Sequence, residues 1–202
     1  MISQFETILT ENKTKERNNM KQQTQTRVRF LATAGLIAGL YTALTVVLAP
    51  FSFGTIQCRV AEMLTVLAVY SPAAVTGLTV GCALSNLIGL TMGANAAGAL
   101  DILLGTLATG LAAWLSYRLG SYRVKGLPVW STIPPVVTNA FIVGTELTLV
   151  VGPKTLPTWF LWAGSVAAGQ IIACVGGGLL LANMLQKAGL DKQLSANNFT
   201  VR

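Results

Sequence analysis

Long apolar runs separated by short polar loops are the feature that most constrains this chain. Such runs recur between Phe30 and Leu185, and most approach the roughly 20 residues that a helix needs to cross a bilayer. Of the 202 residues, 10% are charged, whereas a soluble domain carries roughly 25% and needs them to cover its surface. The sequence therefore predicts an all-α integral membrane protein. It excludes an ordinary soluble enzyme and a nucleic-acid-binding module.

We expect six transmembrane helices inside a membrane domain of residues 28–187. Their expected ranges are 30–49, 60–70, 73–90, 99–119, 130–151 and 158–185. The second is too short for a full crossing and is expected to begin inside the protein, whereas the sixth is long enough to tilt or protrude. Residues 1–27 are expected to form a disordered cytosolic tail, with Met20 as an alternative start, and residues 188–202 a second cytosolic tail.

Basic residues are distributed unevenly between the two ends of these helices. Six crossings place both termini on one side of the membrane, and twelve of the fourteen Lys and Arg residues then lie on that side. Arg59 and Lys154 lie on the other. The positive-inside rule makes the richer side cytoplasmic. The sequence thus predicts a multi-pass cell-membrane protein with both termini and the Arg118–Gly126 loop in the cytoplasm.

The residue inventory excludes several chemistries. The chain has no histidine, so Ser–His and Cys–His catalysis and imidazole-ligated zinc are excluded. Cys58, Cys82 and Cys174 are widely separated, which indicates packing rather than a disulfide or metal site. Residues 152–155 lack the Gly-Lys pair and spacing of a phosphate-binding loop. We expect no enzyme activity, no metal and no cofactor.

Polar and ionisable residues inside membrane helices are costly and usually functional. The predicted topology brings such residues from five segments to one depth near the outer face. The candidate substrate-binding residues are Gln57, Arg59, Glu62, Asn86, Asp101, Asn139, Glu146 and Trp162. Structural alternatives stay open for several of them: an Arg59–Glu62 pair, a helix-dipole role for Asp101, an interfacial belt for Trp162, or a helix-bridging role for Asn139. Their shared depth favours a pocket open to the exterior.

The charges of these residues narrow the ligand class. Glu62, Asp101 and Glu146 against Arg59 leave a formal charge of −2. This balance disfavours an anionic substrate and favours a cationic or donor-rich one, and a nearby tryptophan could stack on a flat ring. A nitrogen heterocycle fits this inventory better than a sugar phosphate or a carboxylic acid.

Small residues recur every four positions in the first expected helix. They form two adjacent rows, Ala34/Ala38 and Gly35/Gly39/Ala43. Rows of this kind permit close helix approach, so two rows are enough for one internal and one external neighbour.

Three stretches carry a family resemblance. Residues 56–64, Ile-Gln-Cys-Arg-Val-Ala-Glu-Met-Leu, resemble the Ile-Gln-x-Arg-x-x-Glu-x-Leu signature of the QueT family, which are substrate-binding S components of energy-coupling factor (ECF) transporters for queuosine precursors. The segments 86–89 with 101–109, and 134–147, are similar as well. The resemblance covers about residues 29–185 and leaves the N-terminal tail outside.

The resemblance implies an S-component-like bundle of six helices that captures substrate outside the cell. It implies association with a T subunit and two cytosolic ATPases, with Ala34-x-x-x-Ala38 as the docking motif for the T subunit. The implied substrate is a 7-deazaguanine, either the aminomethyl or the cyano precursor. A carboxylate could accept the adjacent N–H groups of its guanine-like edge, but the sequence does not indicate which carboxylate does so. The alternatives are an S component for another small vitamin, a stand-alone facilitator, or an assembly subunit.

Overall fold

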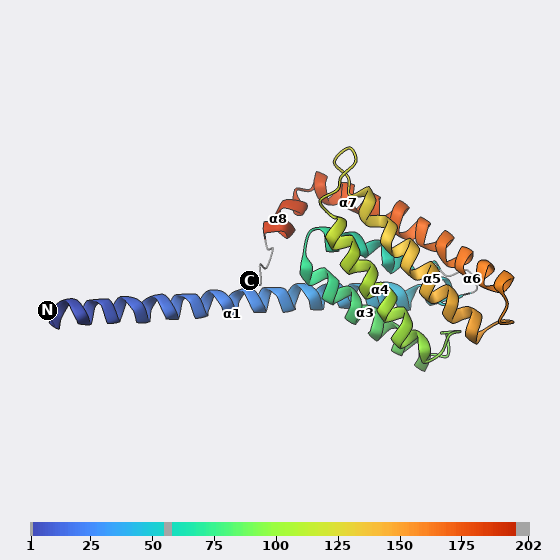
Figure 1. Cartoon of the computed structure of the whole chain (residues 1–202), viewed down its shortest axis with the longest axis horizontal. Coiled ribbons are helices and arrows are strands. Elements are labelled where there is room, and N and C mark those ends of the chain that lie inside the picture. The colour runs from blue at the N-terminus through green and yellow to red at the C-terminus, as the bar shows by residue number, and fades with distance from the viewer. Residues whose placement is uncertain (1, 55–57, 197–202) are drawn as a thin grey trace.

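The computed structural model describes residues 2–54 and 58–196, with side chains for 15–54 and 58–195. Every named element in this part of the chain is helical, which confirms the predicted all-α class (Figure 1). In chain order the elements are α1 (Ile2–Val47), α2 (Ala49–Ser52), η1 (Val60–Val69), α3 (Pro72–Thr91), α4 (Leu100–Leu119), η2 (Val129–Thr132), α5 (Ile133–Val150), α6 (Leu156–Gln170), η3 (Ile171–Gly177), α7 (Gly178–Lys187) and α8 (Leu190–Ala196).

Five helical segments of the described chain are long and apolar enough to cross a membrane. They are 15–47, 72–91, 100–119, 129–150 and 156–187, the last running without a break through α6, η3 and α7. The expected count of six spans is not confirmed, because the second segment, Val60–Val69, falls short of the length of a span. It is a ten-residue 3-10 helix, about 20 Å long at roughly 2 Å per residue, against a hydrocarbon core of about 30 Å.

The short element η1 is the centre of the bundle. It contacts α1, α3, α4, η3 and α7, so it is enclosed by helices from both halves of the chain. Six of its ten residues are buried, including Glu62. A segment this short leaves its polar groups at membrane depth, and the surrounding helices must satisfy them. This placement brings Arg59 and Glu62 into the protein interior.

Residues 1–27 were predicted to form a disordered tail, whereas residues 2–27 belong to the first helix of the structure. Helix α1 begins at Ile2 and projects far beyond the bundle (Figure 1). Its 46 residues extend about 69 Å at 1.5 Å per residue. The chain has no glycine before Gly35 and no proline before Pro50, and it is rich in Lys, Glu, Gln and Arg there, so no helix breaker interrupts the helix. Low hydrophobicity indicated the absence of a packed core but not the absence of a helix.

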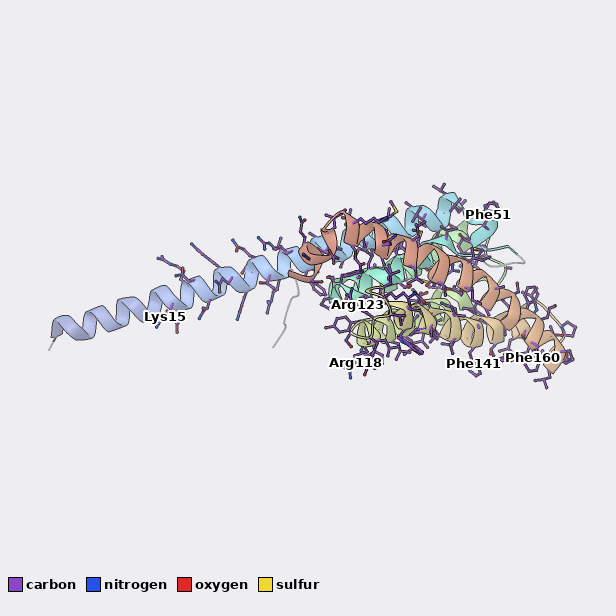
Figure 2. The ribbon with its side chains drawn as sticks, turned by 90° about the horizontal axis from the view of Figure 1, so that it is seen from above. Lys15, Phe51, Arg118, Arg123, Phe141 and Phe160 are labelled. Atoms are coloured by element: carbon purple, nitrogen blue, oxygen red, sulfur yellow. The ribbon has the colours of Figure 1, made fainter. Side chains whose placement is uncertain are left out.

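The outer surface of the bundle is apolar. Leu36, Leu103, Phe141, Leu161 and Leu180 are each at least 60% exposed. Figure 2 shows Phe51, Phe141 and Phe160 pointing away from the helices. A water-soluble monomer rarely exposes such a continuous apolar surface, so the bilayer is its natural surrounding. The chain is a multi-pass membrane protein.

The basic residues of the 118–126 loop lie at the end of the bundle from which α1 projects. Figure 2 shows Arg118 and Arg123 at the end from which α1 projects, while Phe51 and Phe160 lie at the opposite end. The guanidinium of Arg118 stacks on Trp114 at 5.4 Å from the ring centroid, and that of Arg123 on Tyr70 at 5.5 Å. The N-terminal segment and the 118–126 loop thus share one end, as the charge pattern requires.

Orientation relative to the membrane stays a prediction, and single-cysteine labelling tests it. In a chain without the three native cysteines, we expect Thr155→Cys to react with an impermeant thiol reagent added outside intact cells. Ser121→Cys should react only after permeabilisation, because the positive-inside rule places its loop in the cytoplasm. Both positions are exposed, so accessibility in the protein is matched. External labelling at Ser121→Cys with protection at Thr155→Cys would reverse the orientation.

Candidate functional site

An ion pair joins the segment before η1 to the first turn of α4. Arg59 Nη2 lies 3.2 Å from Asp101 Oδ2, and the two side chains are 7% and 0% exposed. Asn95 donates to the same carboxylate oxygen at 2.9 Å. The guanidinium also lies over the Phe53 ring, 5.4 Å from its centroid. The charge partner of Arg59 in this structure is therefore Asp101, and the i,i+3 alternative with Glu62 is not the pair that forms.

Glu62 is held by donors from two other helices. Tyr41 of α1 donates its hydroxyl to Glu62 Oε1 at 2.5 Å, and Thr109 of α4 donates to the same oxygen at 2.8 Å. Glu62 and Tyr41 are fully buried. The carboxylate is thus fixed in orientation, and its second oxygen, Oε2, has no partner among the described residues.

The Asp101 region depends on close packing against α3. Asn86 of α3 donates its side-chain amide to the backbone carbonyl of Asp101 at 2.6 Å. A Cβ added at Gly105 would overlap Asp101 Oδ1 and lie 2.9 Å from Asn86 Nδ2. Glycine at this position therefore leaves the space that the Asp101 side chain occupies.

Replacing Gly105 by alanine tests this packing. The added Cβ should displace the Asp101 side chain from Arg59 and Asn95, and we expect a loss of about 1–3 kcal/mol in the free energy of unfolding, the usual cost of overpacking. Gly164→Ala in α6 is the matched control, since no atom lies within 4 Å of its added Cβ. Unfolding by denaturant in detergent measures both. Equal stability of the two variants would contradict the crowding at Gly105.

Glu146 of α5 is the third carboxylate. It is 0% exposed, and neither of its oxygens has a hydrogen-bond partner in the described part of the chain. Val143 and Leu147 of α5 pack with Ala108 of α4, so Glu146 lies on the helix that packs against the one carrying Asp101. Val143 and Leu147, on either side of it along α5, pack into an apolar cluster that Trp162 covers.

Among the predicted residues that the structure describes, Asn139 and Trp162 have no polar contact with the carboxylates. The Asn139 amide donates to the Pro135 carbonyl of its own helix at 3.0 Å, and not to a carboxylate of the cluster. Gln57 lies outside the described residues. Trp162 is half-buried and packs against the apolar cluster that contains Val143 and Leu147. The ion pair and hydrogen bonds join Arg59, Asn86 and Asp101, and the buried Glu62 and Glu146 lie on η1 and α5, which both pack against α4. These five residues form the cluster.

Sequence reasoning missed four residues that hold these groups: Tyr41, Asn95, Gly105 and Thr109. Tyr41 and Thr109 are ordinary residues for an apolar helix, and nothing in their spacing points to Glu62. Asn95 stands in a loop rich in Gly, Ala and Asn, where a side-chain amide usually serves the turn itself. The only available signal was that a polar group buried in a membrane helix requires a partner.

The unpartnered buried oxygens of the cluster share one property. They are Glu62 Oε2, Asn86 Oδ1, Asp101 Oδ1 and both carboxylate oxygens of Glu146. All five accept hydrogen bonds. An unsatisfied buried polar group costs about 1–3 kcal/mol, so such a set needs donors from elsewhere. With three carboxylates and one guanidinium, the cluster suits a donor-rich or cationic ligand.

The predicted docking residues Ala34 and Ala38 face inward, not outward. They are 7% and 5% exposed and lie against α3. A Cβ at Gly77 would lie 2.6 Å from the Ala34 carbonyl oxygen, and one at Gly81 would lie 2.9 Å from that of Ala38. In this arrangement Ala34 and Ala38 form the internal row of α1, and their role in docking an external partner stays a prediction.

The second row of α1 faces outward. Gly35, Gly39 and Ala43 are exposed, and a Cβ at either glycine would meet no atom within 4 Å. A shallow groove continues from this row onto α3, lined by Gly39, Thr42, Ala43, Val46, Leu84 and Ile88. Helix periodicity explains why one row is buried and the other exposed, because adjacent rows of one helix point about 100° apart and only one of them can contact α3.

Comparison with known proteins agrees with this picture. The chain is 25% identical over 173 residues to the queuosine precursor transporter QueT of Lactococcus lactis subsp. cremoris strain MG1363, covering 80% of this chain and 95% of the relative. No solved structure matches the chain. The sequence model of the QueT transporter family matches residues 31–187, which include all five carboxylate, amide and guanidinium residues of the cluster. This match covers more than half of the chain, and the chain therefore belongs to the QueT transporter family.

Proposed function

We propose that this protein is the substrate-binding membrane subunit of an ECF-type importer for a queuosine precursor of the 7-deazaguanine class. The observation that carries the proposal is the buried cluster whose unpartnered oxygens all accept hydrogen bonds. A guanine-like ring presents N–H donors along one edge, and the aminomethyl precursor adds a cation. The L. lactis relative is named as a queuosine precursor transporter, which supports the same substrate class.

The inventory of the chain supports a subunit that binds but does not power transport. The sequence has no phosphate-binding loop, so the energy for import would come from partners, which we propose to be two cytosolic ATPases and a T subunit. For the T subunit we propose contact through the outward row Gly35, Gly39 and Ala43, because small side chains permit close helix approach. In this role the chain is a transporter subunit and not an enzyme.

Calorimetric titration of the purified chain tests the substrate class. We expect the aminomethyl and cyano 7-deazaguanines to bind, guanine to bind more weakly, and thiamine not to bind. Binding of thiamine without either deazaguanine would replace the substrate assignment by another vitamin. Absence of binding to every one of these compounds would favour a facilitator.

Co-purification tests the assembly separately from the substrate. A tagged chain expressed in its own cells should retain two ATPases and one further membrane subunit after mild detergent extraction. Isolation of a chain that transports precursor in liposomes without ATP would instead identify a stand-alone facilitator. Recovery of an unrelated membrane complex would indicate an assembly subunit.

A further inference from the structure

The three carboxylates of the cluster differ in how many of their oxygens are free. Glu62 Oε1 accepts from Tyr41 and Thr109, and Asp101 Oδ2 accepts from Arg59 and Asn95, so each of these residues keeps one free oxygen. Glu146 has both oxygens free within the described part of the chain. It is also the one carboxylate of the three without a recorded donor, although it is fully buried.

This difference matters because two kinds of ligand group need different acceptors. Adjacent N–H donors on a planar ring, such as the N1–H and 2-amino groups of a guanine, pair with the two oxygens of a single carboxylate. A carboxylate with one oxygen already occupied can accept a single donor well but cannot form both bonds of such a pair. Glu146 can therefore accept both N–H groups of such an edge, whereas Glu62 and Asp101 can each accept a donor on one free oxygen.

We propose that Glu146 is the residue that reads the paired N–H edge of the ring and so determines specificity for the 2-amino group. The free oxygens Glu62 Oε2 and Asp101 Oδ1 then serve donors elsewhere on the ligand, including an ammonium group. The inference rests on the proposed function, since it assigns one contact within the same site. The inference goes beyond the proposed function by naming the residue on which discrimination of the 2-amino group depends.

The position of Glu146 in the fold supports this role. Val143 and Leu147 of the same helix pack with Trp162, Ala97 and Val166, which gives the carboxylate an apolar support beside it. Gly144 holds α5 close to α6, because a Cβ there would lie 2.7 Å from Ala163 Cα. The backbone that carries Glu146 is thus fixed by packing while its carboxylate is left without a protein partner.

The test compares two ligands that differ only in the 2-amino group, 7-deazaguanine and 7-deazahypoxanthine. For the wild-type chain in detergent we expect a preference for 7-deazaguanine of roughly 10- to 100-fold, the range for a hydrogen bond to a charged group. In Glu146→Gln the preference should fall to within about threefold, because the side-chain amide offers one acceptor and turns a donor toward the ring. Glu62→Gln is the matched control: it should bind both ligands more weakly and keep the preference.

A second variant guards against loss of folding. Glu146→Met removes two unsatisfied buried oxygens at similar volume, so it should unfold at the same or a higher denaturant concentration than the wild type and should also lack the preference. Binding of the aminomethyl derivative tests the alternative, in which Glu146 faces the cation. Glu146→Gln could keep the preference for the 2-amino group but no longer bind the aminomethyl derivative more tightly than 7-deazaguanine. In that case Glu146 faces the cation and the inference is wrong.

Failure of the proposed function has a different signature. A wild-type chain that binds neither 7-deazaguanine nor its aminomethyl derivative would refute the substrate class itself. A wild-type chain that binds them, with a preference that disappears in Glu62→Gln and persists in Glu146→Gln, would refute only the assignment of the edge to Glu146.

Discussion

Replacing Arg59 by methionine is expected to lower the free energy of unfolding by about 3–5 kcal/mol, the cost of leaving a buried charge without its partner. The guanidinium is the charged partner of Asp101 at 3.2 Å, and Asp101 is 0% exposed. In the variant the Asp101 carboxylate would keep the Asn95 hydrogen bond but lose its compensating charge. Denaturant unfolding of the purified chain in detergent measures the difference.

The control for this prediction tests which carboxylate pairs with Arg59. Adding Asp101→Asn to Arg59→Met removes the uncompensated charge and should restore at least half of the lost stability. Adding Glu62→Gln instead should restore little, because Tyr41 and Thr109 already hold that carboxylate. Rescue by Glu62→Gln and not by Asp101→Asn would mean that the i,i+3 pair forms in the folded protein and that the pairing described above is incorrect.

The second large effect is expected on α1, where neighbouring positions should respond oppositely to the same substitution. Ala38→Trp should destabilise the chain by at least about 3 kcal/mol, the upper end of overpacking, because its neighbour on α3 is backbone at Gly81 and cannot move aside. Substrate binding should also fall at least tenfold, since Tyr41 lies on the same face and orients Glu62. Binding titration and unfolding of the isolated chain measure both effects.

Gly39→Trp is the matched variant one residue further along. The added side chain has open space. The free energy of unfolding should therefore stay close to that of the wild type, and substrate affinity should stay within about twofold. Recovery of the T subunit and ATPases by the tagged chain should be lost, because the indole blocks close approach on the outward row. A complex that still assembles with Gly39→Trp would show that the partner uses another face. An Ala38→Trp chain that folds and binds normally would show that α1 does not pack on α3 through this row.

The sequence by itself determined the class of the protein. A charged fraction of 10% and apolar runs of about 20 residues leave a membrane helix bundle as the fold that can satisfy the backbone. The same reasoning predicted that residues 60–70 are too short to span, and the structure shows η1 as the short central element. It also selected Arg59, Glu62, Asp101 and Glu146, because ionisable residues in apolar segments are conspicuous without any knowledge of contacts.

Tertiary structure decided which of these groups pair and which face outward. Local spacing offered Glu62 as the partner of Arg59, yet the pair forms with Asp101, 42 positions away, because η1 packs against α4. Both rows of α1 consist of small residues at the same spacing. Only the position of α3 makes Ala34/Ala38 internal and Gly35/Gly39 external. The distinction among the carboxylates has the same origin: Tyr41 and Thr109 reach Glu62 from other helices, and no described donor reaches Glu146. A hydrogen bond between distant segments depends on their relative position, which no single segment encodes.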